Sequence, residues 1–466
     1  MDRRHVTVLV LLVLFVLAAG AMRIRFLFRD AAGLDAKLVC SGVFVSGRSA
    51  ADVRAHSLPF EPPGARFDVD RQAGAVHVRV GRGIVRTARY LGDQGCVAFP
   101  PGVDRVSFEP RRIPTELRPA ARLSWPLGDL AEVGPPQDVN ADELERAVAL
   151  AFADPGAQTT AFLIVHRGRI IAERYAPPYD RGTRFEGWSM GKSITAALAG
   201  RLAELGHLDL DAPTGLAEWS GPADPRARIT PRQLLRMSSG LRFSGPTDSL
   251  VTLLLRGMPD HQAIYMGIDD VFAYALAAPS EHAPGTVGRY RNSDPLALGA
   301  VVRRTLERLG EDYWSWPQRE LFDPIGARGF VLETDTRGNF ILTGFDYGTA
   351  RDWARLGLLF LQDGVFEGRR LLPAGFAGFV ATPAPAWPEP VYGGSFWLNR
   401  TGRVPGIPAS AYWMGGHGEQ RVTLVPTHDL VVVRLGHTAG NEPAGTALAE
   451  ALGAVVRAVP DDRESG

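Results

Sequence analysis

Lysine is nearly absent from this chain of 466 residues. Only Lys37 and Lys192 stand among its 51 basic residues, so arginine supplies almost all of the positive charge. The formal net charge is zero, and no basic run is interleaved with aromatic residues, so we expect no nucleic-acid partner. Histidines are scattered, with no His-x-x-x-His pair beside acidic residues, so we expect neither a metal site nor another cofactor.

Cysteine is equally scarce. Cys40 and Cys96 are the only two in the chain, and both follow an apolar N-terminal run. In an oxidising compartment a single disulfide between them is expected. The alternative is two unrelated buried thiols.

That run is the single long hydrophobic stretch. Arg3 and Arg4 precede residues 6–22, where only Thr7 interrupts the apolar sequence. We interpret residues 1–22 as a signal sequence or an uncleaved membrane anchor. We therefore expect a periplasmic or cell-envelope protein, with the membrane as a partner if the segment is retained. A buried core helix is the alternative, and the missing periodicity argues against it.

Three further segments follow this run. Residues 23–115 are expected to form a small, separate, β-rich module, in which no chemistry is visible; an accessory or interaction role would suit it. Residues 116–140 are rich in proline and indicate a linker. Residues 141–460 then form the main domain.

The main domain alternates in character along the chain. Helices are expected at 142–152, 347–361, 372–381 and 443–456, mostly helical structure at 205–309, and strands at 161–165, 170–175, 394–398, 411–414, 420–425 and 430–435. This order predicts an α+β fold of the three-layer type. One antiparallel sheet would be assembled from the two ends of the domain and flanked by helices, with a helical subdomain beside it.

The strongest chemical signal is Ser189-x-x-Lys192 at the start of an apolar helix. Residues three apart share one helix face, so the lysine can reach the serine hydroxyl. A desolvated lysine can lose its proton and act as a base, whereas arginine cannot. Keeping a lysine at this interior position in an arginine-rich chain indicates catalysis; an ordinary helix with a surface lysine is the alternative.

Two later motifs carry polar or small residues that a site would use. Tyr290-x-Asn292 stands just before an apolar helix, although a loop aromatic and a helix cap would account for both residues. The turn 415–418 brings Gly416 and His417 between two strands, where a glycine backbone can approach a ligand closely. A solvent-exposed turn histidine is the alternative for His417.

These three motifs, in this order, resemble the signature of the penicillin-recognising serine hydrolases. That superfamily includes class C β-lactamases, D-alanyl-D-alanine peptidases, related esterases and 6-aminohexanoate-dimer hydrolases. The flanking stretches LIVHRGRIIAERY, ITPRQLLRMSSGL and GGHGEQRVTLVPTHDLVVVRLG strengthen the resemblance, which covers roughly residues 125–460 and is greatest for the 6-aminohexanoate-dimer hydrolase group.

The resemblance implies a role for each matching residue. Ser189 would be acylated, Lys192 would stay neutral or share a proton with the serine, and Tyr290 would relay the proton to the leaving group. Asn292 would orient Lys192 and the substrate amide. The oxyanion hole would combine the N–H of Ser189 with one from the turn, most simply that of Gly416.

One departure affects the expected substrate. The β-lactamases and many peptidases carry Lys-Thr-Gly on the last motif strand, and this chain has no third lysine to supply it. His417 is a candidate for part of that role. We therefore expect an exported serine hydrolase acting on a small-molecule amide or ester. A β-lactamase or D,D-peptidase is the alternative within the same class, and a catalytically idle, membrane-tethered binding protein is the alternative from another class.

Overall fold

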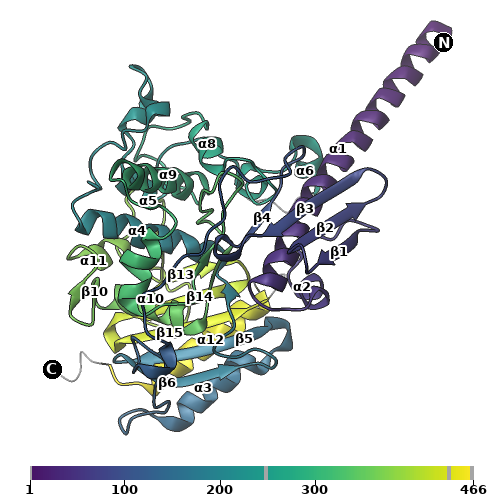
Figure 1. The fold of residues 1–466 in the computed structure, drawn as a ribbon. Helices are drawn as coiled ribbons and strands as arrows, with labels where there is room; N and C mark the ends of the chain where they lie inside the picture. Colours follow the sequence, from purple (N-terminus) through teal and green to yellow (C-terminus); the bar gives the residue numbers. More distant parts are fainter. Residues whose placement is uncertain (1–2, 246–249, 438–441, 462–466) are drawn as a thin grey trace.

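A six-stranded antiparallel sheet organises the main domain in the computed structural model, which describes residues 3–245, 250–437 and 442–461 (Figure 1). Its strand order is β12-β13-β14-β15-β5-β6, so the two ends of the domain meet at the β15–β5 pair, as predicted. The strands are β5 (Thr159–His166), β6 (Arg169–Tyr175), β12 (Trp397–Leu398), β13 (Tyr412–Gly416), β14 (Gln420–Val425) and β15 (Leu430–Gly436).

Helices cover both faces of this sheet, which confirms the three-layer prediction. Along β5, Phe162 and Ile164 face α3 (Ala141–Ala153) and α12 (Glu442–Ala458), while alternate residues face the opposite layer. That layer contains α10 (Ala350–Leu361). Gly357 of α10 lies so close to the sheet that a Cβ there would approach a methyl group of Val431 within 2.8 Å.

A helical region lies beside the sheet, as predicted. Its elements are α4 (Gly191–Glu204), α5 (Pro231–Leu235), α6 (Leu250–Arg256), α7 (Asp260–Ala263), α8 (Val271–Leu276), α9 (Ser293–Arg308) and α11 (Phe376–Val380). A hairpin of β10 (Val365–Phe366) and β11 (Arg369–Arg370) precedes α11. The predicted strand over 394–398 is shorter than expected, because only Trp397 and Leu398 pair with β13.

A second, three-stranded sheet holds the start of α4 in place. It pairs β7 (Phe185–Glu186) and β8 (Val331–Leu332) with β9 (Asp346–Gly348). The expectation of a helix over 347–361 is wrong at its first turn, because residues 346–348 form the central strand of this sheet and the Thr349 side chain caps α10 only after them.

The N-terminal segment is part helix and part sheet. A single helix, α1 (Arg3–Phe44), includes both the apolar run and residues 23–44, and α2 (Ala50–His56) follows it. The expected β-like runs form a four-stranded sheet of β1 (Arg66–Asp70), β2 (Ala75–Val80), β3 (Ile84–Tyr90) and β4 (Cys96–Ala98). A disulfide joins Cys40 of α1 to Cys96 of β4.

This segment is not packed as a separate unit. Leu38 of α1 and Val76 of β2 belong to the same continuous hydrophobic core as Leu198 of α4 and Val431 of β15. The buried Arg86 also donates to the carbonyl of Met266 in the helical region, at 2.6 Å. Residues expected to form an independent module therefore fold against the main domain.

The N-terminal half of α1 extends away from the body of the protein (Figure 1). Many side chains of the apolar run lie outside the described residues, and those of Leu14, Phe15 and Leu17 are exposed. Within the part of the chain that the structure describes, no helix is both long and apolar enough to cross a membrane.

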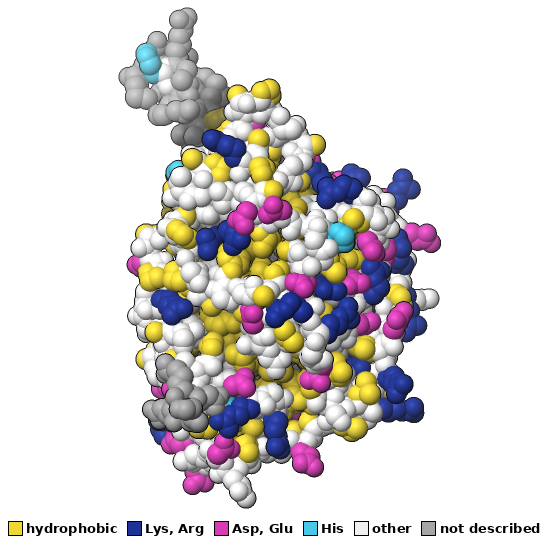
Figure 2. All heavy atoms as spheres, turned by 90° about the vertical axis from the view of Figure 1, so that its left-hand side faces the viewer, with side chains coloured by type: hydrophobic (Ala, Val, Ile, Leu, Met, Phe, Trp, Pro, Cys, Tyr) yellow, Lys and Arg dark blue, Asp and Glu magenta, His cyan; other side chains and the backbone are white. Residues whose placement is uncertain are grey.

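Charge is mixed over the face of the molecule drawn in Figure 2. Basic and acidic side chains alternate there with apolar ones, with no broad field of one sign.

Candidate active site

Ser189 lies at a sharp turn from strand to helix. Strand β7 ends at Glu186, a 3-10 turn spans Trp188–Met190, and α4 begins at Gly191. Trp188 adopts φ +48°, an uncommon conformation for a residue with a side chain. Such local strain is concentrated at functional sites, and here the turn leaves Ser189 partly exposed at the N-terminus of α4.

Lys192 contacts the serine directly. Its Nζ lies 2.9 Å from Ser189 Oγ and 3.3 Å from the carbonyl oxygen of Thr343, which is also 3.5 Å from Ser189 Oγ. The side chain of Lys192 is buried. The structure thus brings together the two residues of the Ser-x-x-Lys motif, with a backbone carbonyl bracing them.

Burial sets the protonation of this lysine. Removal from water lowers the pKa of Lys192 from 10.5 to about 7, against the opposing effect of the Asp346 carboxyl. Asp346 is fully buried against Gly191, and its own pKa is raised well above the ordinary value because burial disfavours its charged form. A substantial fraction of Lys192 is therefore neutral at pH 7 and can accept a proton from Ser189.

Tyr290 completes the polar centre from the loop before α9. Its ring lies 4.8 Å from Lys192 Nζ, measured to the centroid. Burial raises the pKa of Tyr290, and a hydrogen bond with Ser189 opposes this only in part, so the phenol keeps its proton at neutral pH. The arrangement pairs a neutral base with a protonated hydroxyl next to one serine.

Asn292 lies deeper than the expected role requires. It occupies the position before α9 without capping the helix, and its Nδ2 donates to the His261 carbonyl at 2.8 Å and to the Tyr265 hydroxyl at 3.0 Å. The Tyr265 hydroxyl in turn donates to the Thr343 carbonyl at 2.7 Å. Lys192 contacts the same Thr343 carbonyl. Asn292 is therefore linked to Lys192 indirectly, through the Tyr265 hydroxyl and this carbonyl.

The glycine-rich turn lies against the turn that carries the serine. At Gly416, the last residue of β13, a Cβ would fall 2.1 Å from the carbonyl oxygen of Gly187 and 3.1 Å from the Cβ of Trp188. Only glycine permits this approach. His417 is exposed, and its ring contacts the edge of Trp188 with centroids 5.6 Å apart. The three motifs thus converge, as the sequence predicts.

Aromatic side chains form a wall beside this centre. Trp397 of β12 lies between Tyr290, at 5.1 Å between ring centroids, and Gly415, where an added Cβ would contact the indole at 2.9 Å. Trp387 and Tyr392 stack against each other and continue the wall behind Trp397. Trp397 is partly exposed, so an apolar group bound at Ser189 can contact it.

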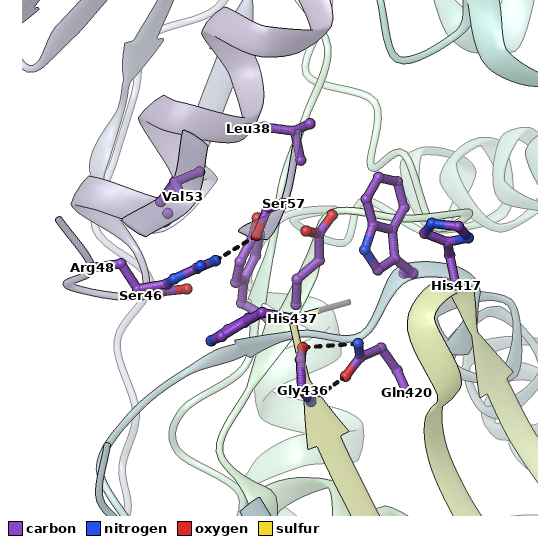
Figure 3. A pocket seen from close by; sticks show the side chains of 13 residues that line it. Leu38, Ser46, Arg48, Val53, Ser57, His417, Gln420, Gly436 and His437 are labelled. Carbon is purple, nitrogen blue, oxygen red and sulfur yellow. Dashed lines mark hydrogen bonds between the residues drawn. The ribbon is translucent and has the colours of Figure 1, made fainter. Parts of the chain in front are cut away.

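A small pocket is lined in part by Trp188 and His417 (Figure 3). The N-terminal segment and the main domain share its lining, which includes Leu38, Arg48, Ser57, Glu186, Trp188, His417, Gln420 and His437. Its cavity volume is about 20 Å³, enough for one or two water molecules. The pocket is too small for a substrate, and Arg48 in it already donates to Ser57 and Asp52.

Sequence reasoning missed several residues around the centre. Tyr265, Thr343 and Asp346 carry no local motif, and they reach the site only through tertiary packing. Lys37 stands in the segment where no chemistry is visible from the sequence, yet it is as buried as Lys192, at 1% exposure, and pairs with Glu333 at 2.7 Å. Its retention in an arginine-rich chain was a usable signal. Among the described residues, no three His, Cys, Asp or Glu side chains gather as metal ligands.

Comparisons with known proteins show the family to which this chain is related. A family model described as Beta-lactamase matches residues 144–457. The chain is 25% identical over 361 residues to a 6-aminohexanoate-dimer hydrolase of Paenarthrobacter ureafaciens, covering 67% of this chain and 84% of that protein.

Solved structures show the same fold. A penicillin-binding protein homolog from Caulobacter crescentus superposes with a TM-score of 0.53 at 18% identity, covering 70% of this chain and 100% of that one. A family VIII carboxylesterase gives a TM-score of 0.51 at 17% identity, covering 69% and 98%. The predicted architecture is confirmed.

Proposed function

The chain belongs to the beta-lactamase family and is a hydrolase, and we propose that it cleaves an amide or ester bond through an acyl-enzyme on Ser189. The single observation that carries this proposal is the 2.9 Å contact between Ser189 Oγ and the Nζ of a buried lysine whose pKa is lowered to about 7. A serine needs a base at this distance to become a nucleophile near neutral pH.

The reaction follows from the positions of the side chains. Neutral Lys192 takes the hydroxyl proton while Ser189 Oγ attacks the substrate carbonyl carbon. The resulting oxyanion would accept hydrogen bonds from the N–H groups of Ser189 and Gly416. Tyr290 donates its proton to the leaving nitrogen or oxygen as the bond to the acyl carbon breaks, and the lysine ammonium restores it. Water then attacks the acyl-enzyme by the reverse proton path, which releases the acid and regenerates Ser189.

We place the substrate among apolar amides and esters. Trp397 and its aromatic neighbours offer contact area to an apolar group, and the chain has no third lysine to bind a substrate carboxylate. A relative named 6-aminohexanoate-dimer hydrolase supports an amide as the bond that is cleaved, and a carboxylesterase with the same fold supports an ester. Penicillins and peptidoglycan peptides carry a carboxylate and are the second candidate class, which the penicillin-binding protein homolog supports.

Intact mass after treatment with a fluorophosphonate tests the mechanism. We expect one adduct on the parent protein, none on Ser189→Ala, and a reaction slowed by at least a hundredfold in Lys192→Arg, because arginine cannot release its proton. Ser193→Ala is the matched control, since Ser193 is buried on the same helix and donates to the Ser395 carbonyl at 2.7 Å. A folded parent without an adduct would refute the proposal and favour an idle, binding-only protein.

The same assay separates the two substrate classes. Pre-incubation with an aromatic ester that carries no carboxylate should protect Ser189 from the probe, whereas benzylpenicillin at equal concentration should not. Stable penicilloylation of Ser189, seen as a mass increase equal to the penicillin, would instead assign the protein to the β-lactamases or D,D-peptidases.

We further propose that the protein is exported to the cell envelope. Support comes from the apolar run behind Arg3 and Arg4 and from the Cys40–Cys96 disulfide, a bond typical of oxidising compartments. Cell fractionation with N-terminal sequencing of the mature protein tests this: recovery of the intact chain, with free thiols, from the cytoplasm would refute it.

A further inference from the structure

Behind Lys192 lies a buried cluster of titratable groups that the proposed reaction does not use. Asp346 and Glu333 are both fully buried, and Lys37 of α1 is buried beside them. Burial raises the pKa of Glu333, while the neighbouring Lys37 opposes this shift. Charges in such a place are costly unless they are paired, so the pairing has consequences for every neighbouring titratable group.

Lys37 is held by three contacts that fix its position. Its Nζ donates to Glu333 Oε2 at 2.7 Å and to the Cys96 carbonyl at 2.6 Å, and it lies 4.3 Å from the ring centroid of Phe345. The N–H of Cys96 donates to the other oxygen of Glu333, at 2.9 Å. The disulfide joins Cys96 to Cys40, which lies one turn after Lys37 on α1. The ion pair and the disulfide therefore hold together one junction, the place where α1, β4 and Glu333 meet.

This junction supports the loop that forms the floor of the active site. The N–H of Glu333 donates to the Phe345 carbonyl at 3.2 Å. Phe345 has a φ of +63°, and its ring packs against Trp188 at 5.4 Å and Tyr265 at 5.5 Å between centroids. Trp188 precedes the nucleophile, and Tyr265 holds the carbonyl that braces Lys192.

The Lys37–Glu333 ion pair is also linked to Lys192 through the charge of Asp346. Leu332, next to Glu333, pairs with Asp346 across β8 and β9, and the Asp346 carboxyl packs under Gly191. Both Glu333 and Lys37 act on the charge of Asp346, which in turn acts on that of Lys192. A chain of neighbouring charges therefore runs from α1 to the base.

We propose that Lys37, supplied by the N-terminal segment, is a positioning residue for the Ser189–Lys192 pair, because its charge neutralises Glu333 and so keeps Lys192 able to lose its proton. The inference rests on the proposed function, in which Lys192 is the base. The segment that looked like an accessory module is then an integral part of the catalytic unit.

The sign of the effect depends on all the groups near each lysine. Besides Ser189, Lys192 faces Asp346 from β9, the neutral phenols of Tyr290 and Tyr265, and His261 from α7, whose pKa is lowered to about 2 by burial and by the charge of Lys192. His261 is therefore uncharged at neutral pH and does not contribute.

Lys37 faces three carboxyl groups, two of them fully buried and one half-buried. These are its partner Glu333, Asp346 of β9, and Glu186 of β7, whose pKa burial raises well above the usual range. Removing the Glu333 charge leaves Lys37 positive without compensation, which disfavours the charged form of Lys192. Removing the Lys37 charge does the reverse.

The test compares the titration midpoint of Lys192 in four proteins: the parent, Glu333→Gln, Lys37→Met and the double variant. The two single variants should shift it in opposite directions. Glu333→Gln should lower the titration midpoint of Lys192 by up to about one pH unit, the order expected for the loss of one nearby buried charge. Lys37→Met should raise it by a smaller amount, because Glu333 without its lysine partner is ionised over a narrower pH range. The double variant should return it to within about 0.3 unit of the parent, because both charges are gone.

The scarcity of lysine makes the measurement direct. Protein labelled with ¹³Cε-lysine has only two side-chain signals, from Lys37 and Lys192, and Lys37→Met removes one and so assigns both. Each variant is titrated by NMR in the full-length chain. Equal Lys192 midpoints in all four proteins, or shifts of the same sign in both single variants, would overturn the inference.

The comparison can still be made if one variant does not fold. Lys37→Met leaves a buried carboxyl unpaired and is the protein most prone to misfold. Glu333→Gln keeps the shape of the side chain, and comparison with the double variant changes only residue 37. Fluorophosphonate labelling of the same samples separates the two proposals. A parent without an adduct refutes the proposed function, whereas a labelled parent with unshifted midpoints refutes only the role of Lys37.

Discussion

Replacing Lys192 by methionine is expected to abolish acylation and, at neutral pH, to stabilise the fold. Methionine fills a similar volume but offers no base to Ser189, so the fluorophosphonate adduct should be lost. The stabilisation follows from burial, because the folded protein holds this lysine with a pKa of about 7, whereas the unfolded chain holds it near 10.5.

The magnitude follows from proton linkage. Between those two pKa values the unfolded chain binds more protons, so the cost of keeping Lys192 buried is full below pH 7 and disappears as the pH rises toward 10.5. This cost is about 4 kcal/mol at pH 7 and about 1.5 kcal/mol at pH 9.5. Methionine gives up the hydrogen bonds to Ser189 and Thr343, worth about 1 kcal/mol each.

The net prediction is a gain of roughly 2 kcal/mol in unfolding free energy at pH 7 that vanishes by pH 9.5. Asp346 is not left charged in the variant, since burial raises its pKa. Urea unfolding of the parent and Lys192→Met, followed by tryptophan fluorescence at both pH values, measures the difference. A variant less stable than the parent at pH 7, or a difference independent of pH, would refute the reasoning.

Three further outcomes are expected. Changing Cys40 and Cys96 together to serine should cost about 4 kcal/mol in unfolding free energy, because the bond closes a loop of 56 residues; reductant should shift the urea midpoint of the parent but not of the variant. Gly191→Ala should abolish labelling and lower the midpoint, because its Cβ would fall 1.7 Å from the Asp346 carboxyl; unchanged labelling would contradict this packing. Trp397→Ala should raise KM for an aromatic ester about tenfold, with kcat little changed, while Trp397→Phe retains most affinity; equal KM values would remove the aromatic wall from the substrate site.

The sequence alone determined the parts of this protein that local spacing encodes. Ser189 and Lys192 are three residues apart on one helix, so their contact needs no information from elsewhere in the chain. Alternating apolar residues fixed the strands near both ends of the domain, and with them the antiparallel sheet. Local pattern failed at residues 347–348, which the sequence assigned to the start of a helix, but strand partners on both sides decided otherwise.

Only the tertiary structure decided how the site is supported. The Thr343 carbonyl reaches Lys192 from 151 residues away, and Asn292 acts through Tyr265. Lys37 contacts Glu333, which is 296 residues away in the sequence. This contact packs an apparently separate module against the main domain behind Lys192. Burial and hydrogen-bond partners depend on which segments pack together, and the pKa of a buried lysine depends on both. Periodicity shows the face that a residue occupies, but the neighbours on that face come from distant parts of the chain.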